Sequence, residues 1–190
     1  MLHRHHRILA GVAAAVLLAW AVTAFADHPS SPGQRRTTSE LNGYEETPLS
    51  LVSPGSGEFT AAIRHDGSAI EWSLTYRNLA DVTQSHIHLG RPATTGGVVL
   101  FLCTNGTPPA GVPMPQPCPA SAGTISGTWT AADVIASTNG QGVQSGQVGL
   151  EQIIDAIRND AAYVNVHTAA HPTGEIRARL LTRGPSHRGD

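Results

Sequence analysis

The chain has 190 residues and a formal net charge of −2, and its 12 basic residues are all arginine. Charged residues make up only 14%, and no dense basic run follows the N-terminal segment, which argues against a nucleic-acid partner. A hydrophobic content of 40% is too high for a disordered chain, while 20 glycines and 13 prolines supply frequent turn signals. These values predict one small, β-rich domain.

Residues 1–26 have the three parts of a secretory signal peptide. Arg4 and Arg7 precede an uncharged run over residues 8–25, and the small-x-small pattern Ala24-Phe25-Ala26 follows as a cleavage site. An uncleaved membrane anchor is the alternative, because the run is near the lower length limit for crossing a bilayer. We therefore expect export to the periplasm, the cell envelope or the medium, with no membrane contact after cleavage.

Export gives a structural role to the only two cysteines. In an oxidising compartment we expect Cys103 and Cys118 to form a disulfide that closes the proline-rich loop between them. Two cysteines outside a C-x-x-C pair make a poor metal site, so a structural bridge is favoured.

Alternation of apolar and polar residues marks the strands. Residues 58–64 and 70–77 alternate with period two, and His65-Asp66-Gly67-Ser68 between them has the composition of a hairpin turn. The uninterrupted apolar run over 98–102 is typical of a central strand. A last hairpin is expected from residues 162–168 and 174–181.

Two short helices interrupt the strands. Thr130 and Asp133 approximate a capping box at the start of the first. The second helix is indicated by four apolar residues at helical spacing: Leu150, Ile153, Ile154 and Ile157. The pattern as a whole predicts an all-β antiparallel β-sandwich or Greek-key barrel with two short helical insertions.

The expected boundaries divide the chain into four parts. A flexible, polar leader over residues 27–38 follows the signal peptide, and the folded domain occupies residues 39–182. Residues 183–190 are expected to form a disordered tail.

Histidines carry the most informative chemistry in the sequence. His86 and His88 flank Ile87, so on a strand their side chains share one face, and His167 lies on the polar face of a later strand. We expect both faces to point outward. Neutral imidazole is a common ligand of zinc and copper, so these three histidines are a candidate site for either metal, with His171 as a further ligand. The same pattern also arises on an ordinary polar strand face that binds nothing.

Neighbouring polar residues extend this candidate site. A turn centred on His171 places His167 opposite Glu175, and Asn165 opposite Arg177. A carboxylate beside a histidine can accept its second N–H and fix its tautomer. We therefore expect Glu175 to orient His167, although these residues also suit simple cross-strand surface pairs.

Catalytic templates are incomplete in this sequence, which contains no H-E-x-x-H, G-x-S-x-G, P-loop or full G-x-G-x-x-G pattern. Glu45 and Glu46 are adjacent, so on a strand they point to opposite faces and do not form an acid/base pair. No catalytic residue is predicted.

Four segments of the chain share a pattern with a known family: Leu41-Asn42-Gly43-Tyr44-Glu45-Glu46-Thr47-Pro48, Ser85-His86-Ile87-His88-Leu89-Gly90, Tyr163-Val164-Asn165-Val166-His167-Thr168 and Pro172-Thr173-Gly174-Glu175-Ile176-Arg177. Through these segments the chain resembles the CHRD (chordin) domain family over residues 39–181. This resemblance implies an extracellular all-β domain, which occurs singly in many bacterial secreted proteins. The binding of bone morphogenetic proteins by chordin is not carried over, because this chain has one domain and none of chordin's cysteine-rich modules.

The His-x-His segment is also similar to the copper strand of Cu/Zn superoxide dismutase, with His167 in the place of a late third ligand. The chain departs from that family because it lacks a histidine/aspartate run for zinc, a bridging histidine and a late glycine/arginine segment. The first expectation is therefore a secreted, non-enzymatic module that binds an extracellular protein or surface ligand through the histidine face, with copper or zinc as the candidate ion. A copper-dependent redox protein and a purely structural envelope protein are the alternatives.

Overall fold

The computed structural model describes residues 35–137 and 139–181. The expected signal peptide, leader residues 27–34 and the tail lie outside the described residues. The helices are η1 (Gly43–Glu45), η2 (Ala131–Asp133) and α1 (Gly146–Arg158). The strands are β1 (Arg35–Asn42), β2 (Ser56–Ile63), β3 (Ile70–Arg77), β4 (Val82–Leu89), β5 (Gly97–Thr104), β6 (Gly123–Trp129), β7 (Ala162–Thr168) and β8 (Ile176–Arg179).

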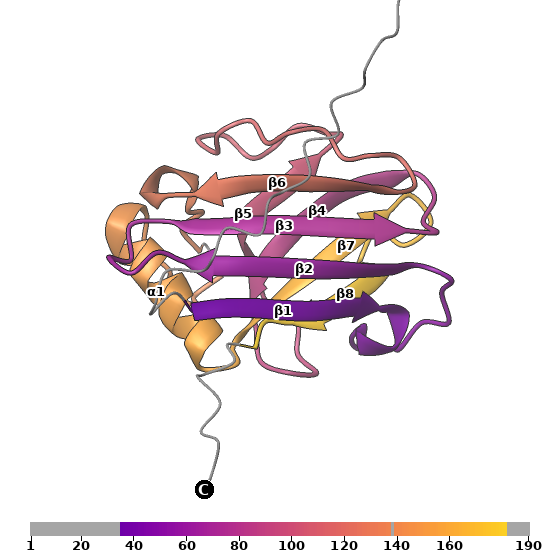
Figure 1. The fold of residues 1–190 in the computed structure, drawn as a ribbon, viewed down its shortest axis with the longest axis horizontal. Helices are drawn as coiled ribbons and strands as arrows, with labels where there is room; N and C mark the ends of the chain where they lie inside the picture. The colour runs from indigo at the N-terminus through magenta and orange to yellow at the C-terminus, as the bar shows by residue number, and fades with distance from the viewer. Residues whose placement is uncertain (1–34, 138, 182–190) are drawn as a thin grey trace, which may run out of the picture. The chain divides into compact units, whose positions relative to one another are not determined.

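The strands form one antiparallel sheet in the order β5-β4-β7-β8-β1-β2-β3-β6. In Figure 1, β6, β3, β2 and β1 form one layer, and β5, β4, β7 and β8 cross behind it. The two terminal strands of this order contact each other, because Trp129 Nε1 donates to the Phe101 carbonyl oxygen at 2.8 Å. The sheet folds over on itself, which confirms the expected all-β sandwich or barrel.

The alternation in the sequence explains which side chains fill the core. In β3, Ile70, Trp72, Leu74 and Tyr76 are buried, and the polar residues between them are exposed or half-buried. Burial of each large apolar side chain contributes about 1.5–3 kcal/mol. The same argument holds for α1, whose four apolar residues predicted to share a face are all buried against the sheet.

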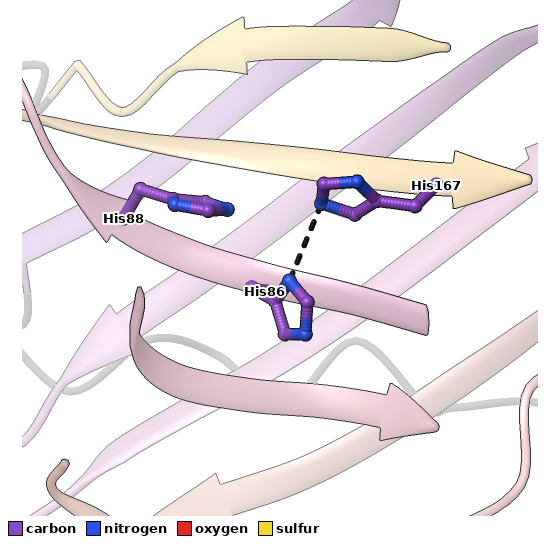
Figure 2. Close-up of side chains that lie close together, drawn as sticks. All are labelled: His86, His88 and His167. Atoms are coloured by element: carbon purple, nitrogen blue, oxygen red, sulfur yellow. Dashed lines mark hydrogen bonds between the residues drawn. The ribbon is translucent and has the colours of Figure 1, made fainter. Parts of the chain in front are cut away.

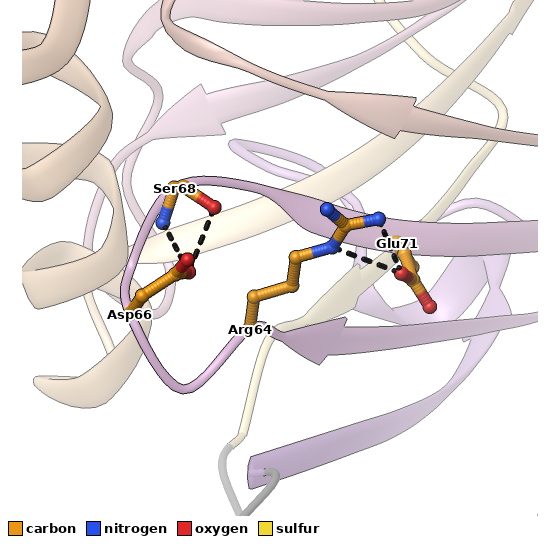
Figure 3. Close-up of polar contacts among 4 residues, drawn as sticks. All are labelled: Arg64, Asp66, Ser68 and Glu71. Atoms are coloured by element: carbon orange, nitrogen blue, oxygen red, sulfur yellow. Dashed lines mark hydrogen bonds and ion pairs between the residues drawn. The ribbon is translucent and has the colours of Figure 1, made fainter.

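The predicted β2–β3 turn is stabilised by its own polar side chains (Figure 3). Asp66 Oδ1 accepts hydrogen bonds from the Ser68 amide at 3.0 Å and from Ser68 Oγ at 2.7 Å. Arg64 Nη2 lies 3.0 Å from Glu71 Oε1 across the strands. Because this ion pair is exposed, it contributes at most about 1 kcal/mol.

The structure differs from two of the expectations. β1 begins at Arg35, inside the segment expected to be a flexible leader, because its backbone pairs with β2 along its whole length and Thr37 is buried. β5, predicted to be central, is the last strand of the order. Its buried residues are covered instead by the opposite layer and by the segment after β6, where the Ile135 amide donates to the Val99 carbonyl oxygen at 3.0 Å.

The expected disulfide joins Cys103 and Cys118. Asn105 holds the same loop, because its side chain donates to the carbonyl oxygens of Val82 at 2.8 Å and Cys118 at 3.1 Å. The disulfide is consistent with export. Within the part of the chain that the structure describes, no helix is long and apolar enough to cross a membrane.

Candidate metal site

Three histidines from two neighbouring strands lie together (Figure 2). His86 and His88 come from β4 and His167 from β7, and one ring nitrogen of each lies within 4.8 Å of the other two. The shortest separation joins His86 Nδ1 and His167 Nε2, at 3.3 Å. The structure therefore brings together the three histidines that the sequence singled out.

The cluster is buried, so the expectation that these faces point outward is wrong. The exposed fractions of His86, His88 and His167 are 3%, 8% and 6%, and every residue of β7 is buried. Segments far away in the sequence cover this face. For example, Arg177 of β8 donates from Nη2 to the Thr94 carbonyl oxygen, in the loop between β4 and β5, at 2.8 Å. The polar residues of β7 therefore form a second buried layer on the side of the strand away from the apolar core.

Backbone carbonyl groups fix two of the rings. His88 Nδ1 lies 3.0 Å from the Gly96 carbonyl oxygen, and His167 Nδ1 lies 3.0 Å from that of Pro172. Since a carbonyl oxygen only accepts hydrogen bonds, both Nδ1 atoms carry the ring proton and both Nε2 atoms keep a lone pair. His88 Nε2 is buried and has no hydrogen-bond partner. Such an atom costs about 1–3 kcal/mol unless something binds it.

Burial keeps the three rings neutral. Desolvation, with smaller contributions from His167 and His88, lowers the pKa of His86 to about 2. Desolvation also lowers the pKa of His88 to about 4, although the bond to Gly96 opposes the shift. The pKa of His167 is lowered by the same cause, against the bond to Pro172. At neutral pH all three imidazoles are in the form that binds metals.

Aromatic packing holds the rings in place. His88 stacks on Tyr163 with ring centroids 4.7 Å apart, and His86 meets the Phe101 ring edge-on at 4.4 Å. The Arg177 guanidinium carbon lies 3.5 Å from the Tyr163 centroid. Because β7 lies between β4 and β8, the Tyr163 ring separates His88 from this buried cation.

The last hairpin has the expected register, since Asn165 pairs with Arg177. Glu175, however, forms no hydrogen bond with His167. Its carboxylate accepts hydrogen bonds from Ser53 Oγ and Thr168 Oγ1, both at 2.7 Å. β8 begins only after Glu175, so this residue lies in the turn rather than in the ladder.

The Pro172 carbonyl takes the role expected of Glu175, because it is the partner of His167 Nδ1. His171 is half-buried in the turn and is not part of the histidine cluster. Sequence reasoning missed Gly96 and Pro172, since a backbone acceptor leaves no trace in the identity of a side chain.

Comparison with protein-family models gives a match to the CHRD domain over residues 37–180. The chain belongs to the CHRD domain family. The matched range contains all three clustered histidines and both cysteines of the disulfide, so the candidate site lies within the CHRD domain itself. Comparisons with curated proteins and with solved structures gave no match.

Proposed function

We propose that this protein is an exported, non-enzymatic CHRD module that binds one copper or zinc ion through His86, His88 and His167. The ligand atoms are His86 Nδ1, His88 Nε2 and His167 Nε2. One observation carries the proposal: three buried, neutral imidazoles from two strands present ring nitrogens to one another within 4.8 Å. Of these nitrogens, His88 Nε2 has no other partner.

The separations support a metal of this kind. Zinc holds imidazole nitrogens at about 2.0–2.1 Å, which puts two tetrahedral ligands about 3.4 Å apart. His86 Nδ1 and His167 Nε2 are 3.3 Å apart. The remaining separations between one ring nitrogen of each histidine are within 4.8 Å.

The donor set narrows the choice of ion. Imidazole suits zinc and copper, whereas magnesium and calcium require oxygen ligands. In the described part of the chain, no carboxylate belongs to the cluster. Three protein ligands leave the fourth position of a tetrahedral ion free for a water molecule.

Metal content and titration test this proposal. The mature protein, purified without a histidine tag, is expected to bind one copper or zinc ion per chain. In the double variant His86→Ala/His88→Ala the affinity should fall by at least about 100-fold, because direct ligands exceed outer-sphere partners in effect. Near-ultraviolet circular dichroism checks that the variant is folded.

A second double variant, His65→Ala/His171→Ala, removes two histidines outside the cluster and should bind as the parent does. Absence of binding by the parent on titration with Cu(I), Cu(II) and Zn(II) would contradict the proposal. Equal binding by parent and His86→Ala/His88→Ala would do so as well.

The carbonyl group that orients His88 provides a finer test. A Cβ atom on Gly96 would overlap the Leu89 carbonyl oxygen, so Gly96→Ala must move the backbone that holds His88 Nδ1. We expect metal affinity to fall about 10–100-fold, the usual effect of losing an outer partner of a histidine ligand. Gly106→Ala is the control, since a Cβ there meets nothing closer than 3.7 Å. Isothermal titration calorimetry should give a lower metal affinity for Gly96→Ala than for Gly106→Ala. Equal affinities would contradict this role of Gly96.

A further inference from the structure

Glu46 and Asn165 form a second buried polar contact beside the histidine cluster. Their exposed fractions are 7% and 3%. Asn165 Nδ2 donates to Glu46 Oε2 at 3.2 Å. The other oxygen of each group, Glu46 Oε1 and Asn165 Oδ1, is buried without a hydrogen-bond partner.

The two unpartnered atoms have a common explanation. If Glu46 is ionised, both are acceptors and neither can satisfy the other, at a cost of about 1–3 kcal/mol each. A single proton on Glu46 Oε1 removes both defects, because the acid O–H can donate to Asn165 Oδ1. A carboxylic acid and a primary amide then form two parallel hydrogen bonds, N–H to Oε2 and O–H to Oδ1.

Gly174 packs directly against this contact. A Cβ atom at this position would lie 2.5 Å from both polar atoms of the Asn165 amide and 2.8 Å from Glu46 Oε2. The φ of Gly174 is +129°, which other residues rarely adopt. The backbone of the turn therefore closes over the pair and leaves no room for a side chain beside it.

The charged groups around Glu46 shift its pKa in opposite directions. Arg177 on β8 favours the ionised carboxyl, whereas Glu175 in the turn opposes it. Among the described residues, Arg177 forms no ion pair with Glu46, and its guanidinium lies instead over the Tyr163 ring. Desolvation outweighs Arg177 and the hydrogen bonds from Asn165 and Thr47, and it raises the pKa of Glu46 to about 7.

We propose that Glu46 holds a proton in the folded protein and forms with Asn165 a buried acid–amide pair, a proton-binding site next to the histidine cluster. Asn165 lies directly opposite His86 in the β4–β7 ladder. Release of the proton leaves the carboxylate and the amide oxygen facing each other and weakens the contact between the η1 segment and β7. The inference does not depend on a bound metal.

Carboxyl-carbon NMR of protein labelled at glutamate tests the proposal on the unmodified chain. The Glu46 signal, assigned by its absence in Glu46→Gln, is expected to titrate with a midpoint near pH 7 rather than near the usual 4.5. A midpoint near 4.5 would overturn the proposal, because the folded protein would then hold an ionised Glu46 at neutral pH.

Stability against pH gives an independent test. Since the folded-state pKa of Glu46 lies above the unfolded value, the proton stabilises the fold below pH 4.5, and this stabilisation is lost as the pH rises through 7. Glu46→Gln keeps an N–H in place of the acid O–H at every pH. The difference between the melting temperatures of the variant and the parent, variant minus parent, should therefore rise between pH 4.5 and pH 8.

Glu175→Gln is the matched control. Both oxygens of Glu175 accept hydroxyl hydrogen bonds, so an amide there removes one of the two acceptors and should lower the melting temperature at pH 8. Glu46→Gln should not lower it at that pH. If Glu46→Gln is as destabilising at pH 8 as Glu175→Gln, the acid–amide pair is refuted.

Discussion

At pH 5 the metal-free protein is expected to be about 4 kcal/mol less stable than at pH 7.5 because of His86 and His88. In the unfolded chain both imidazoles take up a proton near pH 6.5. In the folded chain burial lowers the pKa of His86 to about 2 and that of His88 to about 4, so neither is protonated at pH 5. The unfolded state therefore binds more protons. Below pH 6.5, each unit by which the pH is lowered reduces the free energy of unfolding by about 1.4 kcal/mol for each histidine.

Urea unfolding in the presence of a chelator at pH 7.5 and pH 5 measures this loss. The variant His86→Gln/His88→Gln should lose about 4 kcal/mol less than the parent over the same interval. His65→Gln removes an exposed histidine from the β2–β3 turn and should keep the parent's acid sensitivity. An identical loss in the parent and the double variant would show that these rings are not buried and neutral. The Glu46 proton acts in the opposite sense, since its stabilisation is lost as the pH rises.

Removal of the disulfide is expected to lower the free energy of unfolding by about 3 kcal/mol. The bridge joins residues 15 positions apart, and its loss frees the loop in the unfolded chain. The fold should survive at moderate temperature, because Asn105 still bonds the loop to the Val82 carbonyl oxygen. Guanidinium unfolding of Cys103→Ala/Cys118→Ala, beside the parent with and without reductant, measures the effect.

Reduced parent and double variant should unfold at nearly the same denaturant concentration. A loss well under 1 kcal/mol would indicate that the loop is already restricted in the unfolded chain without the bridge. A loss far above about 5 kcal/mol would exceed what loop closure explains.

The sequence predicts local structure well because the rules involved act over a few residues. Period-two alternation predicts β2 and β3, and the turn between them follows from Asp66-Gly67. Thr130 and Asp133 form the expected capping box. The place of β5 at the end of the sheet could not be predicted, since strand order depends on contacts between distant segments and an apolar run reports only burial.

The candidate site likewise has a part that the sequence predicts and a part that it does not. Spacing predicts that His86 and His88 share a face, and alternation predicts that His167 lies on the polar face of its own strand, where the structure brings it to the other two. The orientation of His88 and His167 depends on Gly96 and Pro172, whose contribution is a backbone carbonyl group that the residue type does not reveal. The role of Glu46 was invisible for a further reason, because its partner Asn165 is more than a hundred positions away.

The contact between the two end strands of the sheet bears on how the protein resists aggregation. A strand at the end of a sheet offers free backbone groups on which another chain can add, the first step toward fibrous assemblies. In this fold the Val99 and Phe101 carbonyl oxygens of β5 are already bonded to Ile135 and Trp129. The closure that buries the core therefore also withdraws these positions from strand addition by a second copy of the chain.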